Sequence, residues 1–124
     1  MKIKIKNKEY EINLINNEAS KQVINNLPIK GNLVRWGDEV YILVDFDIPI
    51  EKDDGKIFEV GDIIYWKSSK SGNKGIAVFF GNTPSSDKPK ANDNCICKLI
   101  GKLNTKKYNI NDVEKGSFLE ITKE

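Results

Sequence analysis

An almost wholly apolar run in the second half of the chain constrains the fold more than any other feature of the sequence. Residues 76 to 80 read Ile-Ala-Val-Phe-Phe and lead directly into the loop Gly81-Asn82-Thr83-Pro84. A half-solvated strand alternates apolar and polar residues, whereas a strand that is apolar on both faces has to be covered on both faces. We therefore expect this strand in the core or beneath a groove, and the two phenylalanines stand at the end where the loop begins.

The size and composition of the chain fit one globular domain spanning residues 1–124. Hydrophobic residues make up 39% and charged residues 31%, which is too apolar for a disordered chain, and 124 residues can bury one core without disulfides or a metal. The 20 basic and 18 acidic side chains are interspersed along the sequence. Proteins that bind phosphate backbones concentrate basic residues on one face, so nucleic acid is disfavoured as a partner.

Two features predict a cytoplasmic protein. The segment from Lys2 to Lys6 alternates lysine with isoleucine, and no stretch has the apolar length of a signal peptide or a membrane span. Cys95 and Cys97 are the only cysteines, and on a strand they would share one face about 7 Å apart, which is long for a disulfide. Because the chain has no histidine, two thiolates cannot complete a zinc site, so we expect buried free thiols, no metal and no cofactor.

The spacing of apolar and turn residues predicts mostly strands. Short alternating runs are separated by turn signals, among them the Gly37-Asp38 dipeptide of a tight hairpin. One short helix is expected from Asn17 to Leu27, with Asn16 or Asn17 as its N-cap and Pro28 closing the segment. A brief helical turn is expected within residues 105 to 115. The expected strands cover residues 2–6, 9–15, 31–36, 39–46, 63–66, 76–80, 95–103 and 117–121. About eight strands predict a barrel or sandwich, and a closed barrel is favoured because it leaves no strand edge exposed.

Three sequence blocks together resemble one family. They read Arg35-Trp36-Gly37-Asp38-Glu39-Val40-Tyr41, preceded by Leu27-Pro28 and Gly31; Val60-Gly61-Asp62-Ile63-Ile64-Tyr65-Trp66; and Val78-Phe79-Phe80-Gly81-Asn82-Thr83-Pro84. In order and spacing they resemble small stand-alone prokaryotic proteins with the cyclophilin-like fold. The resemblance implies a mainly β protein: a closed eight-stranded barrel with one or two short helices, reduced from that of the true peptidyl-prolyl isomerases.

The resemblance also implies site residues. Leu33-Val34-Arg35 is similar to the Phe-x-Arg strand that holds the catalytic arginine of cyclophilins, and Phe80 would be the pocket aromatic of the paired-Phe strand. Val40 stands where cyclophilins have another pocket phenylalanine, and neither their Gln-Gly-Gly-Asp pattern nor their histidine is present. Besides the catalytic candidate Arg35, the expected ligand-binding residues are Phe80, Tyr41, Phe79, Val40, Tyr65 and Thr83.

Isomerisation of an X-Pro bond is a reaction that a chain with few catalytic residue types can carry out. The barrier is rotation against amide resonance, so the reaction needs an apolar cup and one strong donor rather than a nucleophile or a proton shuttle. Arg35 is the donor candidate, and its structural alternative is an ion pair with Asp38 or Glu39 across the turn. Phe79 and Phe80 point to opposite faces of a strand, so at least one of them belongs to the core. No serine or acid pattern supports nucleophilic or acid–base hydrolysis.

We expect a module that binds a small molecule or a proline-containing extended peptide in a groove lined by Arg35, Tyr41 and Phe80, with weak or absent isomerase activity. One alternative is a functioning peptidyl-prolyl isomerase that uses Arg35. Another is an oligomerising scaffold domain, in which an aromatic face is buried between copies of the chain.

Overall fold

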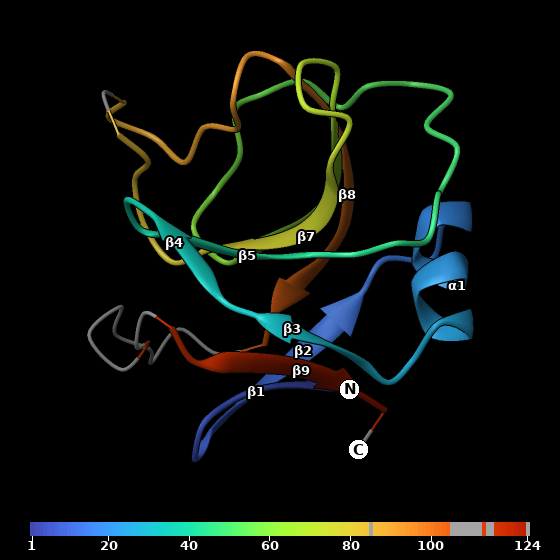
Figure 1. The fold of residues 1–124 in the computed structure, drawn as a ribbon, viewed down its shortest axis with the longest axis vertical. Helices are drawn as coiled ribbons and strands as arrows, with labels where there is room; N and C mark the ends of the chain where they lie inside the picture. Colours follow the sequence, from blue (N-terminus) through green and yellow to red (C-terminus); the bar gives the residue numbers. More distant parts are fainter. Residues whose placement is uncertain (85, 105–112, 114–115, 124) are drawn as a thin grey trace.

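The computed structural model describes the whole chain except residues 85, 105–112, 114–115 and 124. Its described part contains one helix and nine strands, so the fold is mainly β (Figure 1). The helical turn expected within residues 105 to 115 lies almost wholly outside the described residues. In chain order the elements are β1 (Lys2–Ile5), β2 (Lys8–Leu14), α1 (Glu18–Asn25), β3 (Ile29–Asn32), β4 (Val34–Trp36), β5 (Glu39–Leu43), β6 (Asp62–Ser68), β7 (Lys74–Phe79), β8 (Cys95–Leu103) and β9 (Phe118–Thr122).

The strands form one antiparallel sheet in the order β3-β9-β1-β2-β8-β6-β7-β5-β4. The prediction of a closed eight-stranded barrel is wrong in detail, because the sheet has nine strands and its end strands β3 and β4 are not paired with each other. The cause lies at Leu33, within the predicted strand 31–36. Its N–H donates to Ser117 O at 2.7 Å and extends the pairing with β9 by one residue, and from Val34 on the bent chain pairs with β5 instead.

Local signals in the sequence account for the other elements. β1 and β2 form the expected hairpin, and β4 and β5 form a second one around Gly37, whose φ of 62° suits glycine. The helix begins after Asn17, whose side chain accepts a hydrogen bond from Ser20 N at 2.8 Å and so acts as the predicted N-cap. No helix among the described residues is long and apolar enough to cross a membrane.

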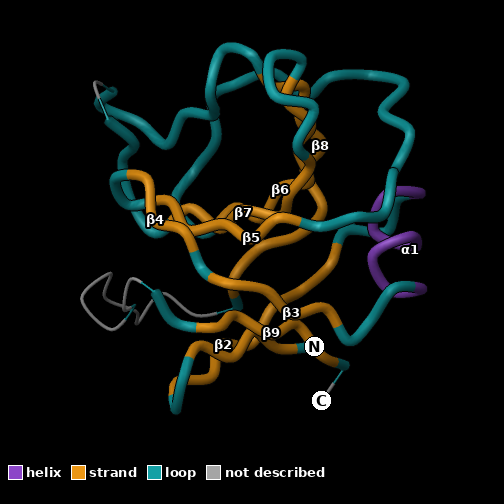
Figure 2. Tube along the Cα trace, viewed as in Figure 1, coloured by secondary structure: helices purple, strands orange, loops and turns teal. Residues whose placement is uncertain are grey.

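β7 is buried on both faces, as predicted from its apolar sequence, and separates two hydrophobic clusters. The inner cluster fills the space enclosed by the curved sheet and the helix, and the outer cluster lies under two long loops that gather at one end of the molecule (Figure 2). The outer cluster contains Phe58, Ile64, Ala77, Phe79, Ala91, Cys95 and Cys97. The inner cluster contains Ile3, Ile5, Tyr10, Ile12, Ala19, Val23, Ile29, Leu33, Val40, Ile42, Ile48, Ile63, Tyr65, Ile76, Val78, Phe80, Ile100, Val113, Leu119 and Ile121.

Candidate functional site

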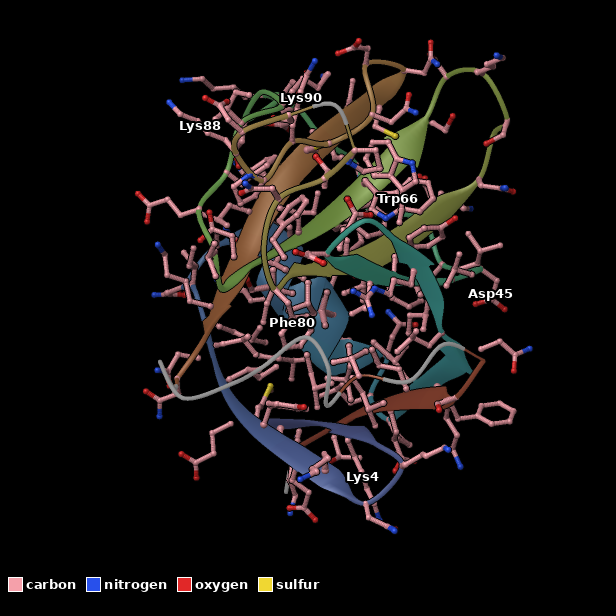
Figure 3. All side chains as sticks on the ribbon, turned by 90° about the vertical axis from the view of Figure 1, so that its left-hand side faces the viewer. Lys4, Asp45, Trp66, Phe80, Lys88 and Lys90 are labelled. Atoms are coloured by element: carbon pink, nitrogen blue, oxygen red, sulfur yellow. The ribbon has the colours of Figure 1, made fainter. Side chains whose placement is uncertain are left out.

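Most of the predicted ligand-binding residues lie in the two clusters. Val40, Tyr65 and Phe80 belong to the inner cluster, and Phe80 contacts Tyr10 edge-to-face with ring centroids 5.6 Å apart. Phe79 belongs to the outer cluster and stacks on Phe58. These four predicted residues are at most 7% exposed, so in this conformation they support the strands rather than present a surface. Figure 3 shows Phe80 well below Trp66, in a different part of the molecule.

Two predicted residues with polar tips are satisfied within the protein. The Tyr65 hydroxyl donates to Phe46 O and accepts from Ile48 N, both at 3.1 Å. The Thr83 hydroxyl donates to Lys90 O at 2.8 Å and accepts from Lys90 N at 3.0 Å, which ties the loop after β7 to itself. Both hydroxyl groups therefore hold loops in place.

Arg35 is engaged in the hairpin turn that follows it. Its Nε donates to Gly37 O at 2.8 Å, and its Nη2 forms an ion pair with Asp38 Oδ1 at 3.0 Å. This is one of the two ion pairs that the sequence offered as the structural role of Arg35. Val34 and Trp36, the residues on either side of it, line a groove, so alternation along β4 directs Arg35 to the opposite face.

The groove is a cavity of about 590 Å³ on the outer side of β4, β5 and β6, a volume typical of ligand pockets. Of the predicted site residues only Tyr41 lines it. The neighbours of Tyr41 follow from strand geometry, since Glu39 and Leu43 share its face of β5 and Trp36 lies opposite Glu39 across the hairpin. We call this cavity the outer groove, and its lining consists of Val34, Trp36, Glu39, Tyr41, Leu43, Ile64, Trp66, Ser68, Lys70, Ser71, Asn73, Ala91, Asn92, Asn94 and Cys95.

Aromatic rings dominate the apolar part of the outer groove. Tyr41 and Trp66 meet edge-to-face, with centroids 5.4 Å apart and planes at 88°. Trp66 lies over Gly75 of β7, where an added Cβ would be 2.5 Å from Trp66 Cζ2. The indole Nε1 of Trp66 is buried and has no hydrogen-bond partner among the described residues. A strong donor is therefore left unsatisfied in the wall of the groove.

Glu39 supplies an acid to the same groove. It is only 6% exposed, and its carboxyl forms no hydrogen bond or ion pair with the described part of the chain. Burial raises the pKa of Glu39 to about 8. Burial, followed by the nearby charges of Glu39 and Cys95, also raises the pKa of the Tyr41 hydroxyl. Glu39 was not among the residues predicted to bind a ligand, although alternation along β5 from Tyr41 places it in the groove.

The two cysteines belong to the outer cluster and share one face of β8, as their i, i+2 spacing predicted. Both are buried and form no disulfide. Burial raises the pKa of Cys97 to about 12 and also raises that of Cys95, whose side chain lines the groove. Neither is an activated thiolate. Among the described residues there is no group of three or more histidine, cysteine, aspartate or glutamate side chains that could hold a metal ion.

A second cavity, of about 490 Å³, lies between the end of α1, β3 and the segment after β5. Its charged lining residues, Lys30 and Asp45, are exposed to solvent. It therefore lacks the combination of aromatic rings and buried, unpaired polar groups that distinguishes the outer groove.

Comparisons with known proteins agree with the fold. The cyclophilin-like family model matches residues 1–122. The solution structure of the hypothetical protein AF2241 from Archaeoglobus fulgidus is similar to this chain, with a TM-score of 0.77 and 26% sequence identity, over 99% of this chain and 92% of that chain. No curated protein matches the sequence. With a family match over nearly its whole length, the chain belongs to the cyclophilin-like family, as its three sequence blocks predicted.

Proposed function

We propose that this protein binds a small organic molecule or an extended peptide segment in the outer groove, with weak or absent peptidyl-prolyl isomerase activity. One observation carries the proposal: the groove contains a buried carboxyl at Glu39 and a buried indole N–H at Trp66, neither with a partner among the described residues. Leaving a buried polar group unsatisfied costs about 1–3 kcal/mol. A ligand with complementary groups would recover part of that cost on binding.

The geometry around Arg35 supports the low isomerase activity. The reaction requires a donor beside the prolyl nitrogen and an apolar cup for the ring. Arg35 donates to Gly37 O and Asp38, while Phe80 is 7% exposed in the inner cluster. Neither side chain lines the outer groove.

We also propose a cytoplasmic location for the protein. The free, buried cysteines support it, because thiols stay reduced in the cytoplasm.

The two tryptophans of the chain provide a direct test of binding, because both line the outer groove. We would titrate the ¹⁵N-labelled protein with a library of small neutral and charged compounds and short extended peptides, and follow the two indole N–H resonances. Binding should shift the Trp66 resonance. Tyr41→Leu should lower the binding affinity at least about threefold, which is about 0.7 kcal/mol of binding free energy. Phe118→Leu is the control, since Phe118 is a 65% exposed aromatic outside the groove. If no compound shifts either indole resonance at millimolar concentration, the proposal is wrong.

Isomerase activity is the second candidate function, favoured by membership of the cyclophilin-like family. The test is the cis-to-trans relaxation of a short Xaa-Pro peptide with micromolar wild-type protein or Arg35→Ala. We expect both proteins to leave the rate within about twofold of the uncatalysed rate, and Arg35→Ala to lose at most about 1 kcal/mol of stability, as for an exposed ion pair. A strong acceleration that disappears in Arg35→Ala would instead establish an isomerase.

A further inference from the structure

We propose that the ligand of the outer groove carries an alkylammonium group, which pairs with the carboxylate of Glu39 among the rings of Trp36, Tyr41 and Trp66. This inference rests on the proposed function, because it names the class of ligand bound in the same groove.

The charges of the groove favour a cation. Glu39 is the one acid among its described lining residues, and Lys70 is the one base. Lys70 lies exposed at the rim and forms no ion pair with Glu39 among the described residues. A buried carboxylate is stable only when a cation or several donors compensate for its lost hydration. An ammonium group offers both, with a positive charge and N–H donors in one small head.

The aromatic lining favours the same group. Trp36 and Tyr41 come from the neighbouring strands β4 and β5, Trp66 comes from β6 on the other side of β7, and all three line one cavity together with Glu39. The electron-rich faces of tryptophan and tyrosine attract cations, and the attraction is stronger when the cation is desolvated, as it would be beside a residue that is 6% exposed. An anionic ligand would gain nothing from the faces of these rings and would be repelled by ionised Glu39.

The size of the groove favours a cation with an apolar chain. Its volume of about 590 Å³ far exceeds that of an ammonium ion, and Val34, Leu43 and Ile64 provide apolar walls. An oxygen acceptor on the same ligand would satisfy the unpartnered Trp66 Nε1. A free alkylamine and the side chain of lysine in an extended peptide share this chemistry, so the experiment includes both.

The first experiment compares three ligands of equal length. Butylammonium, 1-butanol and butanoate are titrated at pH 8 while the two indole N–H resonances are followed. We expect butylammonium to bind at least about tenfold more tightly than the other two, or about 1.4 kcal/mol. Glu39→Gln should remove this preference and leave the affinity for 1-butanol within about twofold. Glu51→Gln removes the same charge from an exposed residue outside the groove and should behave like wild type.

The pH dependence provides a second readout. The charge of Glu39 contributes to the raised pKa values of Tyr41 on β5 and of Cys95 and Cys97 on β8, and these three groups are neutral at pH 7. Burial raises the pKa of Glu39 to about 8. Below pH 8 the Glu39 carboxyl is therefore mostly protonated, and it has to lose this proton when a cation binds. The affinity for butylammonium should therefore rise up to about tenfold per pH unit from pH 6 to pH 8 and then level off. In Glu39→Gln it should not change with pH.

A pair of peptides distinguishes the two sources of the ammonium group. A blocked extended peptide with a central lysine is compared with its norleucine counterpart and with butylammonium. Tighter binding of the lysine peptide would assign the groove to peptides, and tighter binding of the free amine would assign it to small molecules; both support an ammonium ligand. Equal shifts by butylammonium, 1-butanol and butanoate would overturn this inference while leaving groove binding intact. No shift by any ligand would overturn both.

Discussion

Glu39 connects the candidate site to the stability of the protein. Burial raises its pKa from 4.5 to about 8, so between these pH values the folded protein holds a proton that the unfolded chain has lost. The free energy of unfolding then falls as pH rises, by up to roughly 1.4 kcal/mol per pH unit from this one group. The full destabilisation is reached above pH 8. The groove therefore keeps a destabilising acid, which is more easily explained by binding than by folding.

Glu39→Gln should abolish this pH dependence, because glutamine resembles the protonated acid and does not titrate. The free energy of unfolding of the variant minus that of wild type should be larger at pH 8 than at pH 5, by at least about 2 kcal/mol. Urea unfolding at pH 5, 6.5 and 8 measures the difference, in which the titration of all other groups cancels. The Glu51→Gln control should show a difference from wild type that does not change with pH. A constant difference for Glu39→Gln as well would mean that Glu39 is ionised throughout in the folded protein.

At the scale of elements, β7 positions the wall of the groove because Gly75 has no side chain. Gly75 pairs with Trp66 on β6 and with Leu43 on β5, and Trp66 occupies the space where a side chain would stand. An added Cβ would also be 2.6 Å from Ile42 O, in the backbone of β5. The strand interior would disfavour glycine on propensity alone, so close packing of the indole explains its presence.

Gly75→Ala should displace Trp66 and lower the free energy of unfolding by about 1–3 kcal/mol, as expected for overpacking. The displaced indole should show red-shifted fluorescence and a changed indole N–H resonance. Gly72→Ala is the control: its φ of 76° strains any side chain, but an added Cβ there meets nothing within 4 Å. It should lose about 1 kcal/mol without changing the fluorescence. An unshifted Trp66 signal in Gly75→Ala would contradict this account of the groove.

The elements also show which parts of the fold could be predicted from sequence. β8 has the predicted bounds, and the Asn17 N-cap and the Gly37 hairpin follow from local chemistry. The bend at Leu33 could not be predicted, because it depends on pairing with Ser117 and β9, far along the chain. Tyr41, one of the predicted residues, lines the groove. The other predicted residues of this hairpin, Arg35 and Val40, are each one position away from the residues that line it, Trp36 and Glu39. Since β7 is apolar on both faces, its sequence does not distinguish the inner cluster from the outer one.

At the scale of the whole molecule, one sheet separates a core that supports the fold from a core that supports the groove. Ile63 and Ile64 are neighbours on β6, and each is 1% exposed. Ile63 belongs to the inner cluster and Ile64 to the outer cluster, where it also lines the groove. They offer a matched pair for separating stability from the properties of the site.

Ile63→Val and Ile64→Val should each reduce the free energy of unfolding by about 0.5–1.5 kcal/mol, because each removes one buried methylene. Only Ile64→Val should shift the indole N–H resonances of Trp36 and Trp66 and alter ligand affinity. Urea unfolding and ¹⁵N spectra of the two variants provide the comparison. Equal effects on the indole resonances would show that the two clusters respond as one.

The position of β9 has a consequence for how the protein is made. β9 lies between β3 and β1, and these two strands pair with it on either side. A ribosome delivers β1 and β3 well before residues Phe118–Thr122. The nascent chain can form its early hairpin, but it has to wait for this late strand before β1 and β3 belong to the same sheet. The joining of β1 and β3 into one sheet therefore depends on a strand that is synthesised long after both of them.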